Sequence, residues 1–244
     1  MTVDKIDEVL ARFGVCKEFG FLTRCDLTRL PEFYRPWIDT CDAVRSLPEL
    51  TTDNLITYED WRTAHLLLVT ITSGYIWSGD PLEAPLVLPR NLCTPLVAVS
   101  ERLGMRPVIC HASACLANWN LIDPSLPFSL DNLQLNAFKF LDSKANHWFF
   151  TIEKDFAPCI YDIIRAVFYS MEGNLLYIEM ALYSVVNCLN MASKTMKRMP
   201  ENLSPREFYH LLRPFLWGYN EGSLKQRGII FEVIYQASFN THID

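Results

Sequence analysis

Apolar residues recur along most of this chain at steps of three and four positions, the spacing of one face of an α-helix. The longest series of this kind ends just before Pro200, a residue that cannot continue a helix. Its members are Leu175, Ile178, Leu182, Val185, Leu189, Ala192, Met196 and Met199. Alternation with a period of two, which is typical of half-buried strands, is nearly absent. The pattern therefore predicts a mainly α-helical protein.

Local signals place two further helices in the first third of the chain. Apolar positions between residues 4 and 13 indicate an amphipathic helix, and Gly14 suits the left-handed turn that closes one. Thr57 followed by Asp60 indicates an N-cap for a long helix over residues 58–77. The proline-rich residues 30–48 between these helices are expected to be mostly irregular.

Two more helix starts are marked by a capping residue followed by proline. Thr94-Pro95 predicts a helix that runs through Leu103 and is closed by Gly104. Ser204-Pro205-Arg206-Glu207 combines a capping box with proline at the first helical position. Pro214 lies further along this second helix and is expected to kink it.

Composition favours a folded body with a large core. Half of the 244 residues are hydrophobic and 20% are charged, which suits one or two globular domains. We expect a loose division near residue 105, with a small helical domain over residues 1–105 and part of a larger helical domain over residues 106–244.

Charge and cysteine usage argue against several classes of partner. The formal net charge of −6, with no basic run beyond Lys194–Arg198, argues against nucleic acid. Residues 63–79, a central stretch without formal charge, fall short of the roughly 20 apolar residues of a membrane span. No secretory signal is visible, and the eight cysteines lack Cys-x-x-Cys pairing. We therefore expect a cytoplasmic protein with buried thiols and no membrane partner.

Few residues suggest chemistry on their own. By composition, an aromatic pair such as Phe149-Phe150 is core more often than ligand site. Arg213 lies among apolar residues, so its guanidinium must find an anionic partner or reach solvent. The partner would be either a substrate carboxylate or a protein Asp or Glu. His111 and Cys115 lack a third metal ligand at useful spacing, which favours packed or hydrogen-bonded roles.

The remaining polar groups add little. Glu153, Lys154 and Asp155 form a small charge group at an expected helix start, which is usually a solvated face. A Ser-His-Asp order, a glycine-rich phosphate loop and an HExxH pattern are all missing from the sequence. Spacing and composition alone thus indicate no more than a helical protein.

Short motifs along nearly the whole chain occur in an order that is more specific than any one of them. They are Gly20-Phe21-Leu22, Leu30-Pro31, Leu88-Pro89, Pro95-Leu96, Arg102-Leu103-Gly104 with Pro107, Leu116-Ala117-Asn118-Trp119, Asp123-Pro124, Trp148-Phe149-Phe150, Phe208–Gly218 and Gly228–Glu232. The series resembles the indoleamine 2,3-dioxygenase family, within the haem tryptophan dioxygenase superfamily.

The resemblance implies a mainly α fold, in which a small N-terminal helical domain precedes an incomplete large all-α haem-binding domain. It implies haem b as cofactor, and L-tryptophan or a related indole amine with dioxygen as substrates. The implied reaction cleaves the indole ring to N-formylkynurenine, in the kynurenine pathway of tryptophan catabolism. The protein's task there is mainly to position the substrate, so no side chain is assigned as a catalytic acid or base.

The family's site residues carry over onto matching positions. Those implied in substrate binding are Phe149, Phe150, Phe208, Arg213 and Leu216. Those implied in lining the distal pocket are His111, Ala114, Cys115 and Glu153. Phe149 matches the aromatic residue that stacks on the indole, and Arg213 matches the arginine that binds the carboxylate. His111 and Glu153 depart from the family, which usually has an aromatic and a small residue at these positions.

The resemblance is expected to end at Glu232. The family's glycine- and serine-rich loop and its helix with the proximal histidine do not occur in residues 233–244, so we expect a C-terminally shortened, impaired member and no metal ligand in this chain. The alternative is a non-catalytic relative that binds an indole, an amino acid or a protein partner without haem.

Overall fold

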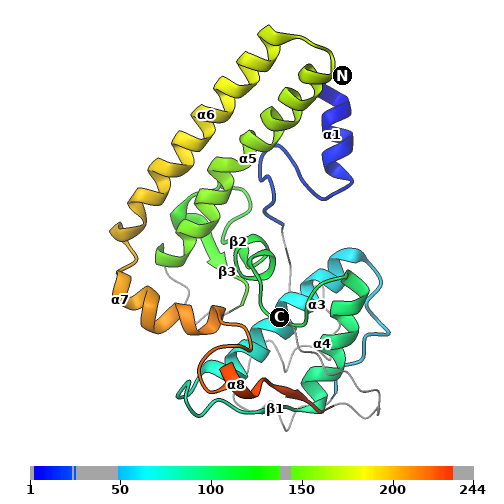
Figure 1. Ribbon diagram of the computed structural model, residues 1–244, viewed down its shortest axis with the longest axis vertical. Coiled ribbons are helices and arrows are strands. Elements are labelled where there is room, and N and C mark those ends of the chain that lie inside the picture. The colour runs from blue at the N-terminus through cyan, green and yellow to red at the C-terminus, as the bar shows by residue number, and fades with distance from the viewer. Residues whose placement is uncertain (1–2, 24, 26–48, 138–143, 233–244) are drawn as a thin grey trace. The chain divides into compact units, whose positions relative to one another are not determined.

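The computed structural model describes residues 3–23, 25, 49–137 and 144–232, in which helices dominate (Figure 1). The chain divides into two compact units, each built from two segments. The first unit comprises Met1–Asp26 with His111–Leu212, and the second comprises Leu27–Cys110 with Arg213–Asp244. The predicted mainly α fold is confirmed, because the strands among the described residues are only two or three residues long.

The sequence-based domains, 1–105 and 106–244, stay a prediction. One junction between the two units, from Cys110 to His111, lies near that division. The sequence did not predict that each unit combines two separated segments of the chain. The proline-rich residues 30–48 lie outside the described residues.

A long helical hairpin forms the body of the first unit. It consists of α5 (Lys144–Met171) and α6 (Leu175–Arg198), which lie side by side (Figure 1). The predicted end of α6 before Pro200 is confirmed. Helix α1 (Val3–Ala11) packs on α5 and closes at Gly14, whose φ of 69° is left-handed as predicted.

A small antiparallel sheet organises the core of the first unit beside α5. Strand β2 (Trp119–Leu121) pairs with β3 (Leu133–Leu135), which follows the 3₁₀ turn η5 (Leu130–Asn132). The core cluster consists of Leu22, Trp119, Leu121, Leu133, Leu135 and Phe150. The buried amide of Asn136 donates to the carbonyl oxygens of Cys25, at 2.6 Å, and Trp119, at 2.9 Å. This amide therefore ties the N-terminal segment to the sheet.

Short helical turns begin and end the long segment of the first unit. The π-helix η4 (Ala112–Leu116) begins it, and the 3₁₀ turn η7 (Met199–Glu201), α7 (Pro205–Glu207) and the π-helix η8 (Phe208–Leu212) end it. The predicted capping box of Ser204 and Glu207 is present. Where a kink was expected at Pro214, the helix changes to 3₁₀ form in η9 (Arg213–Leu216) of the second unit. Pro214 has no N–H for an α-helical bond, which accounts for the change.

Two helices pack together in the second unit. The first, α3 (Tyr58–Trp77), has the predicted bounds and the predicted Thr57 cap. The second, α4 (Arg90–Leu103), ends at Gly104 as predicted, but it begins after Pro89. The predicted start at Thr94-Pro95 is therefore wrong, and Pro95 lies inside the helix.

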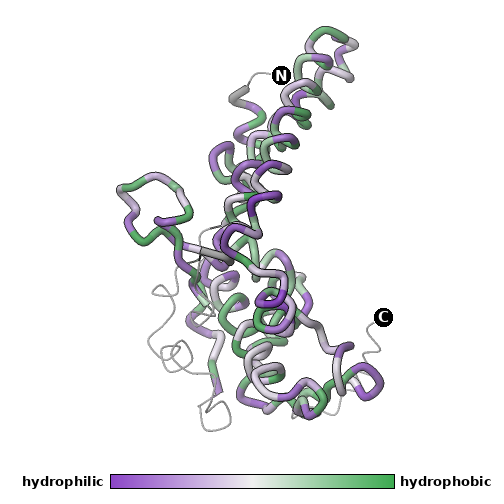
Figure 2. Tube along the Cα trace, turned by 90° about the vertical axis from the view of Figure 1, so that its left-hand side faces the viewer, coloured by the Kyte–Doolittle hydropathy of each residue, from purple (hydrophilic) through white to green (hydrophobic). Residues whose placement is uncertain are grey.

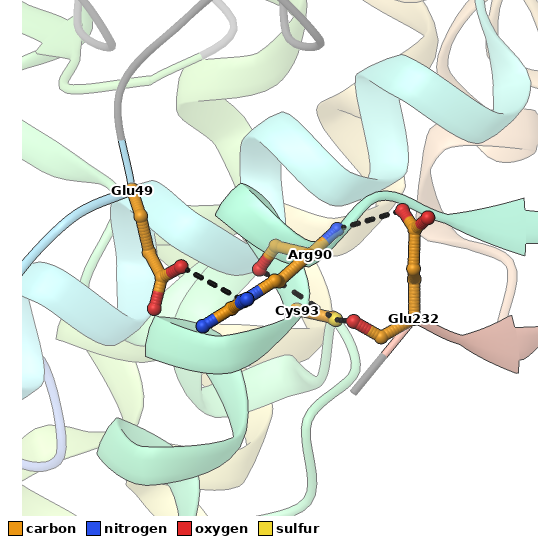
Figure 3. Close-up of polar contacts among 4 residues, drawn as sticks. All are labelled: Glu49, Arg90, Cys93 and Glu232. Atoms are coloured by element: carbon orange, nitrogen blue, oxygen red, sulfur yellow. Dashed lines mark hydrogen bonds and ion pairs between the residues drawn. The ribbon is translucent and has the colours of Figure 1, made fainter. Parts of the chain in front are cut away.

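The early start of α4 has a cause far away in the sequence (Figure 3). Strand β4 (Ile230–Phe231), which follows α8 (Leu224–Arg227), pairs in parallel with β1 (Val87–Leu88) and delivers Glu232 to the first turn of α4. The backbone N–H of Arg90 donates to Glu232 Oε2 at 3.2 Å. The side-chain Nε of Arg90 lies 3.1 Å from Glu49 Oε2. A carboxylate at a helix N-terminus satisfies a free N–H and complements the helix dipole.

The thiol of Cys93 lies beneath this cap. Its Sγ donates to the backbone carbonyl of Glu232 at 3.4 Å (Figure 3). Burial raises the pKa of Cys93 to about 11, and the hydrogen bond to the Glu232 carbonyl only partly offsets this. Of the other described cysteines, Cys25 and Cys159 are buried and Cys16 is exposed, so the expectation of buried thiols is confirmed only in part.

Helix α6 exposes half of the positions of its predicted apolar stripe, namely Leu175, Leu182, Leu189 and Met196. Hydrophobic positions recur along the hairpin (Figure 2), yet α6 buries only Ala181, Ala192 and Thr195. Among the described residues, one helical stretch, Leu175–Glu201, is long and apolar enough to cross a membrane by length and composition, and 11% of its apolar window is buried. The absence of a membrane partner stays a prediction.

Candidate functional site

The predicted site residues fall in both units. Those in the first unit are His111, Ala114 and Cys115 at η4, Phe149, Phe150 and Glu153 on α5, and Phe208 at the start of η8. Those in the second unit are Arg213 and Leu216, both on η9.

The structure brings Phe149 and Phe208 together. Their ring centroids lie 6.3 Å apart, with 37° between the ring planes, which is within the range of favourable aromatic pairs. Both residues are only partly buried. They therefore form an aromatic wall, built from two segments of the first unit, that still has ring surface to offer to a ligand.

Phe150 lies in the core instead. It is 1% exposed and packs with Trp119 and Leu135 in the core cluster of the first unit. One step along an α-helix turns a side chain by about 100°, so neighbours such as Phe149 and Phe150 face different surroundings. The ring of Phe150 therefore packs α5 against the core of the first unit and has no exposed surface for direct contact with a substrate.

His111 and Glu153 form an ion pair that the sequence did not predict. His111 Nε2 donates to Glu153 Oε1 at 2.9 Å, and the two side chains are 62% and 22% exposed. Glu153 lies within α5, one turn after Phe149, so the prediction that it belongs to a solvated helix start is wrong. The pair joins η4 to α5.

Both π-helices of the first unit carry predicted pocket residues. Ala114 and Cys115 lie on η4, and Phe208 begins η8. The carbonyl of Leu116 holds η4 in place, since it accepts the backbone N–H of Thr23 at 2.8 Å. Single π-helical turns are rare and frequently occur at functional sites.

Arg213 stands on a turn that is anchored in the core of the second unit. The carbonyl of Phe215 accepts the Ser73 hydroxyl of α3, and Trp217 contacts Trp77 edge-on at 5.4 Å. Phe215 and Trp217 therefore pack against the core of the second unit, whereas Arg213 itself is exposed. A substrate carboxylate and a protein carboxylate both remain candidates for its partner.

A haem iron needs an axial ligand such as histidine, and two of the described histidines are too enclosed to serve. His65 is 1% exposed, with its Nε2 3.2 Å from the carbonyl oxygen of Arg106. His147 is 5% exposed, and its Nδ1 lies 2.9 Å from the carbonyl oxygen of Leu130. A porphyrin face could not approach either ring without unfolding its surroundings.

Of the two more accessible histidines, His111 already donates from Nε2 to Glu153, and the ring of His210 contacts Tyr209 edge-on, with 5.2 Å between the ring centroids. Within the described residues, no group of three or more His, Cys, Asp or Glu could hold a metal ion. The enclosed rings of His65 and His147 therefore do not fit a haem iron.

Comparison with known proteins gives the family of this chain. The family described as "Indoleamine 2,3-dioxygenase" matches residues 9–242. The match passes Glu232 and overturns the expectation that the family resemblance ends there.

Curated relatives agree over most of the chain. Indoleamine 2,3-dioxygenase 1 of Mus musculus is 30% identical over 94% of this chain and 60% of its own length. Indoleamine 2,3-dioxygenase 2 of Homo sapiens is 29% identical over 93% of this chain and 60% of its own length. A protein named myoglobin from Haliotis diversicolor is 27% identical over 95% of this chain and 64% of its own length. The chain spans about 60% of the length of the first two relatives, and it belongs to the indoleamine 2,3-dioxygenase family.

Proposed function

We propose that this chain binds L-tryptophan or a related indole amine through the aromatic wall of Phe149 and Phe208, as the substrate-binding part of a cytoplasmic dioxygenase. The contact between these two rings, in a chain of this family, is the observation that supports the proposal. An indole ring can stack against such a wall, and burial of its apolar surface would supply most of the affinity.

The proposed reaction is that of the family, in which both atoms of dioxygen enter the indole ring and N-formylkynurenine is formed. Haem b would activate the oxygen. Because no axial ligand of the iron is assigned among the described residues, the part proposed for this chain is to bind and orient the indole. Arg213 is proposed to bind the substrate carboxylate and Leu216 to contact the substrate, on the resemblance alone.

Calorimetric titration with L-tryptophan tests the aromatic wall. Phe149→Ala should weaken binding roughly tenfold or more, because a stacked ring and its buried area are lost. The control is Tyr177→Ala, which removes one ring of another aromatic pair, on the hairpin, where Tyr169 and Tyr177 stack at 5.0 Å. Equal effects of the two variants would contradict the proposal.

Arg213→Ala tests the carboxylate role. L-tryptophan should lose roughly tenfold to a hundredfold in affinity, as expected for a charge-assisted hydrogen bond, whereas tryptamine, which lacks the carboxylate, should lose little. Equal losses for the two ligands would refute the assignment.

Haem binding separates the two candidate functions of the chain. A Soret band with a histidine-ligated ferrous spectrum, after haem is added to the purified protein, would support the dioxygenase. Indole binding without such a band would support the non-catalytic relative. The enclosed rings of His65 and His147 are the observation in favour of this second function.

A further inference from the structure

The ion pair of His111 and Glu153 lies beside the proposed aromatic wall. Residues four apart on a helix are neighbours on one face, so Glu153 shares the face of α5 that carries Phe149. That face also contacts Phe208 through the ring of Phe149. A carboxylate is therefore placed at the edge of the surface to which an indole is proposed to bind.

Glu153 has acceptor capacity to spare. An ionised carboxylate can accept about four hydrogen bonds. Among the described residues, His111 is the donor that reaches it, at Oε1, and Oε2 has no donor there. With only 22% of the side chain exposed, water reaches this group poorly, and a further donor would stabilise it.

The neighbouring cation does not neutralise Glu153. Lys154 Nζ donates to the carbonyl of Glu18 at 3.2 Å and lies 5.3 Å from the centre of the Phe19 ring. It belongs to the interface between α5 and the N-terminal segment. Oε2 of Glu153 can thus accept a hydrogen bond from water or from a ligand.

We propose that Glu153, oriented by His111, accepts a hydrogen bond from a hydroxyl group on the ring of the bound indole. The site would then prefer indole amino acids that carry a ring hydroxyl over those that lack one. This inference rests on the proposed function, because the ring must first bind at Phe149 and Phe208. Glu153 is here a specificity-determining residue and His111 a positioning residue.

The test compares ring-hydroxylated tryptophans with their methoxy counterparts, which are substituted at the same position but have no hydroxyl donor there. Calorimetric titration of the wild-type protein should show at least one hydroxyl isomer binding roughly tenfold more tightly than its methoxy partner, the effect of one charge-assisted hydrogen bond. Glu153→Met should abolish this preference. Glu179→Met, which removes an exposed carboxylate of α6, is the matched control and should keep the preference.

Two further variants separate recognition from folding. Glu153→Gln keeps an acceptor oxygen without charge, so it should retain part of the preference even if Glu153→Met is unstable. His111→Ala should weaken the preference, and His111→Gln, which can still donate to Glu153, should restore part of it.

The outcomes distinguish the two proposals. If neither L-tryptophan nor any derivative binds the wild-type protein, the proposed function fails. If L-tryptophan binds and Phe149→Ala weakens it, but hydroxyl and methoxy isomers bind alike, the function stands and the role of Glu153 is overturned. The pair is then an ion pair of the surface kind, which contributes little.

Discussion

Gly20 brings the N-terminal segment against α5 more closely than any other residue would allow. Its φ of 58° is left-handed, and the hydrogen bond from its N–H to the Cys16 carbonyl closes a tight turn. A Cβ at this position would lie 2.8 Å from Ala157 Cβ and 2.9 Å from Ala157 Cα. Since Ala157 belongs to α5, neither atom can move without shifting the helix.

Gly20→Ala should therefore lower the free energy of unfolding of the first unit by roughly 2–4 kcal/mol, from backbone strain plus overpacking. Gly173→Ala is the matched control, because Gly173 also has a left-handed φ, of 69°, but no atom within 4 Å of an added Cβ. This control should lose roughly 1–2 kcal/mol from backbone strain alone. Urea denaturation measures both losses, and equal values would mean that the contact with Ala157 relaxes freely.

His65 makes the second unit sensitive to acid. Burial lowers the pKa of His65 below its ordinary 6.5, and this outweighs the hydrogen bond to Arg106. The unfolded chain therefore takes up a proton at a higher pH than the folded chain. The resulting stability is fully present above about pH 6.5 and is lost as the pH falls below it. His65→Gln should flatten this dependence in denaturant unfolding measured from about pH 8 to about pH 5. An unchanged slope would show that another group causes it.

At the scale of elements, the start of α4 depends on a carboxylate supplied by β4. Glu232→Ala should destabilise the second unit by about 1 kcal/mol. The backbone N–H of Arg90 in the first turn would lose its acceptor, and the N-terminus of α4 would lose the anion that complements the helix dipole. The same substitution should also speed alkylation of Cys93, because the backbone carbonyl that accepts the thiol hydrogen bond is no longer anchored to α4 through the Glu232 side chain. Glu221→Ala removes an exposed carboxylate from the same unit and is the control. Alkylation followed by mass spectrometry, with thermal unfolding, gives both readouts.

Elements with local causes could be predicted from the sequence, whereas those with remote causes could not. The start of α3 follows from Thr57 and the end of α6 from Pro200, each within two residues of the helix it limits. The start of α4 could not be predicted, because its cap, Glu232, lies at the other end of the chain. The two-residue pairing of β1 with β4 is likewise too short to leave an alternating pattern.

The candidate site likewise has features that could be predicted from the sequence and features that could not. The family motifs identified Phe149 and Phe208, and the structure places their rings in contact. The pairing of His111 with Glu153 spans two distant segments, and no local spacing indicates it. The different surroundings of Phe149 and Phe150 depend on the packing of Trp119 and Leu135, which an aromatic pair in a sequence does not reveal.

At the scale of the whole molecule, we expect the exposed apolar side chains of the hairpin of α5 and α6 to determine how strongly the protein self-associates. Leu182, Val186 and Leu189 on α6 are 51%, 52% and 49% exposed. Contiguous exposed apolar surface of this kind promotes association.

Changing Leu182, Val186 and Leu189 together to Gln should reduce self-association and binding to nonionic detergent, without loss of helical circular dichroism. The control is Ile56→Gln with Leu82→Gln, which changes side chains of the second unit that are 85% and 75% exposed. Light scattering with and without detergent makes the comparison. If the control lowers association as much as the α6 variant does, exposed apolar residues in general are responsible and not the hairpin.

Because each unit is assembled from two separated stretches of polypeptide, the order of synthesis on the ribosome matters. Helices α3 and α4 leave the ribosome early, but the strand that completes their unit, β4, is translated only after the whole hairpin. Such distant pairings slow folding and leave apolar surface uncovered in the meantime. The nascent chain should thus depend on chaperones through most of its translation, and a ribosomal pause before residue 230 would lengthen that dependence.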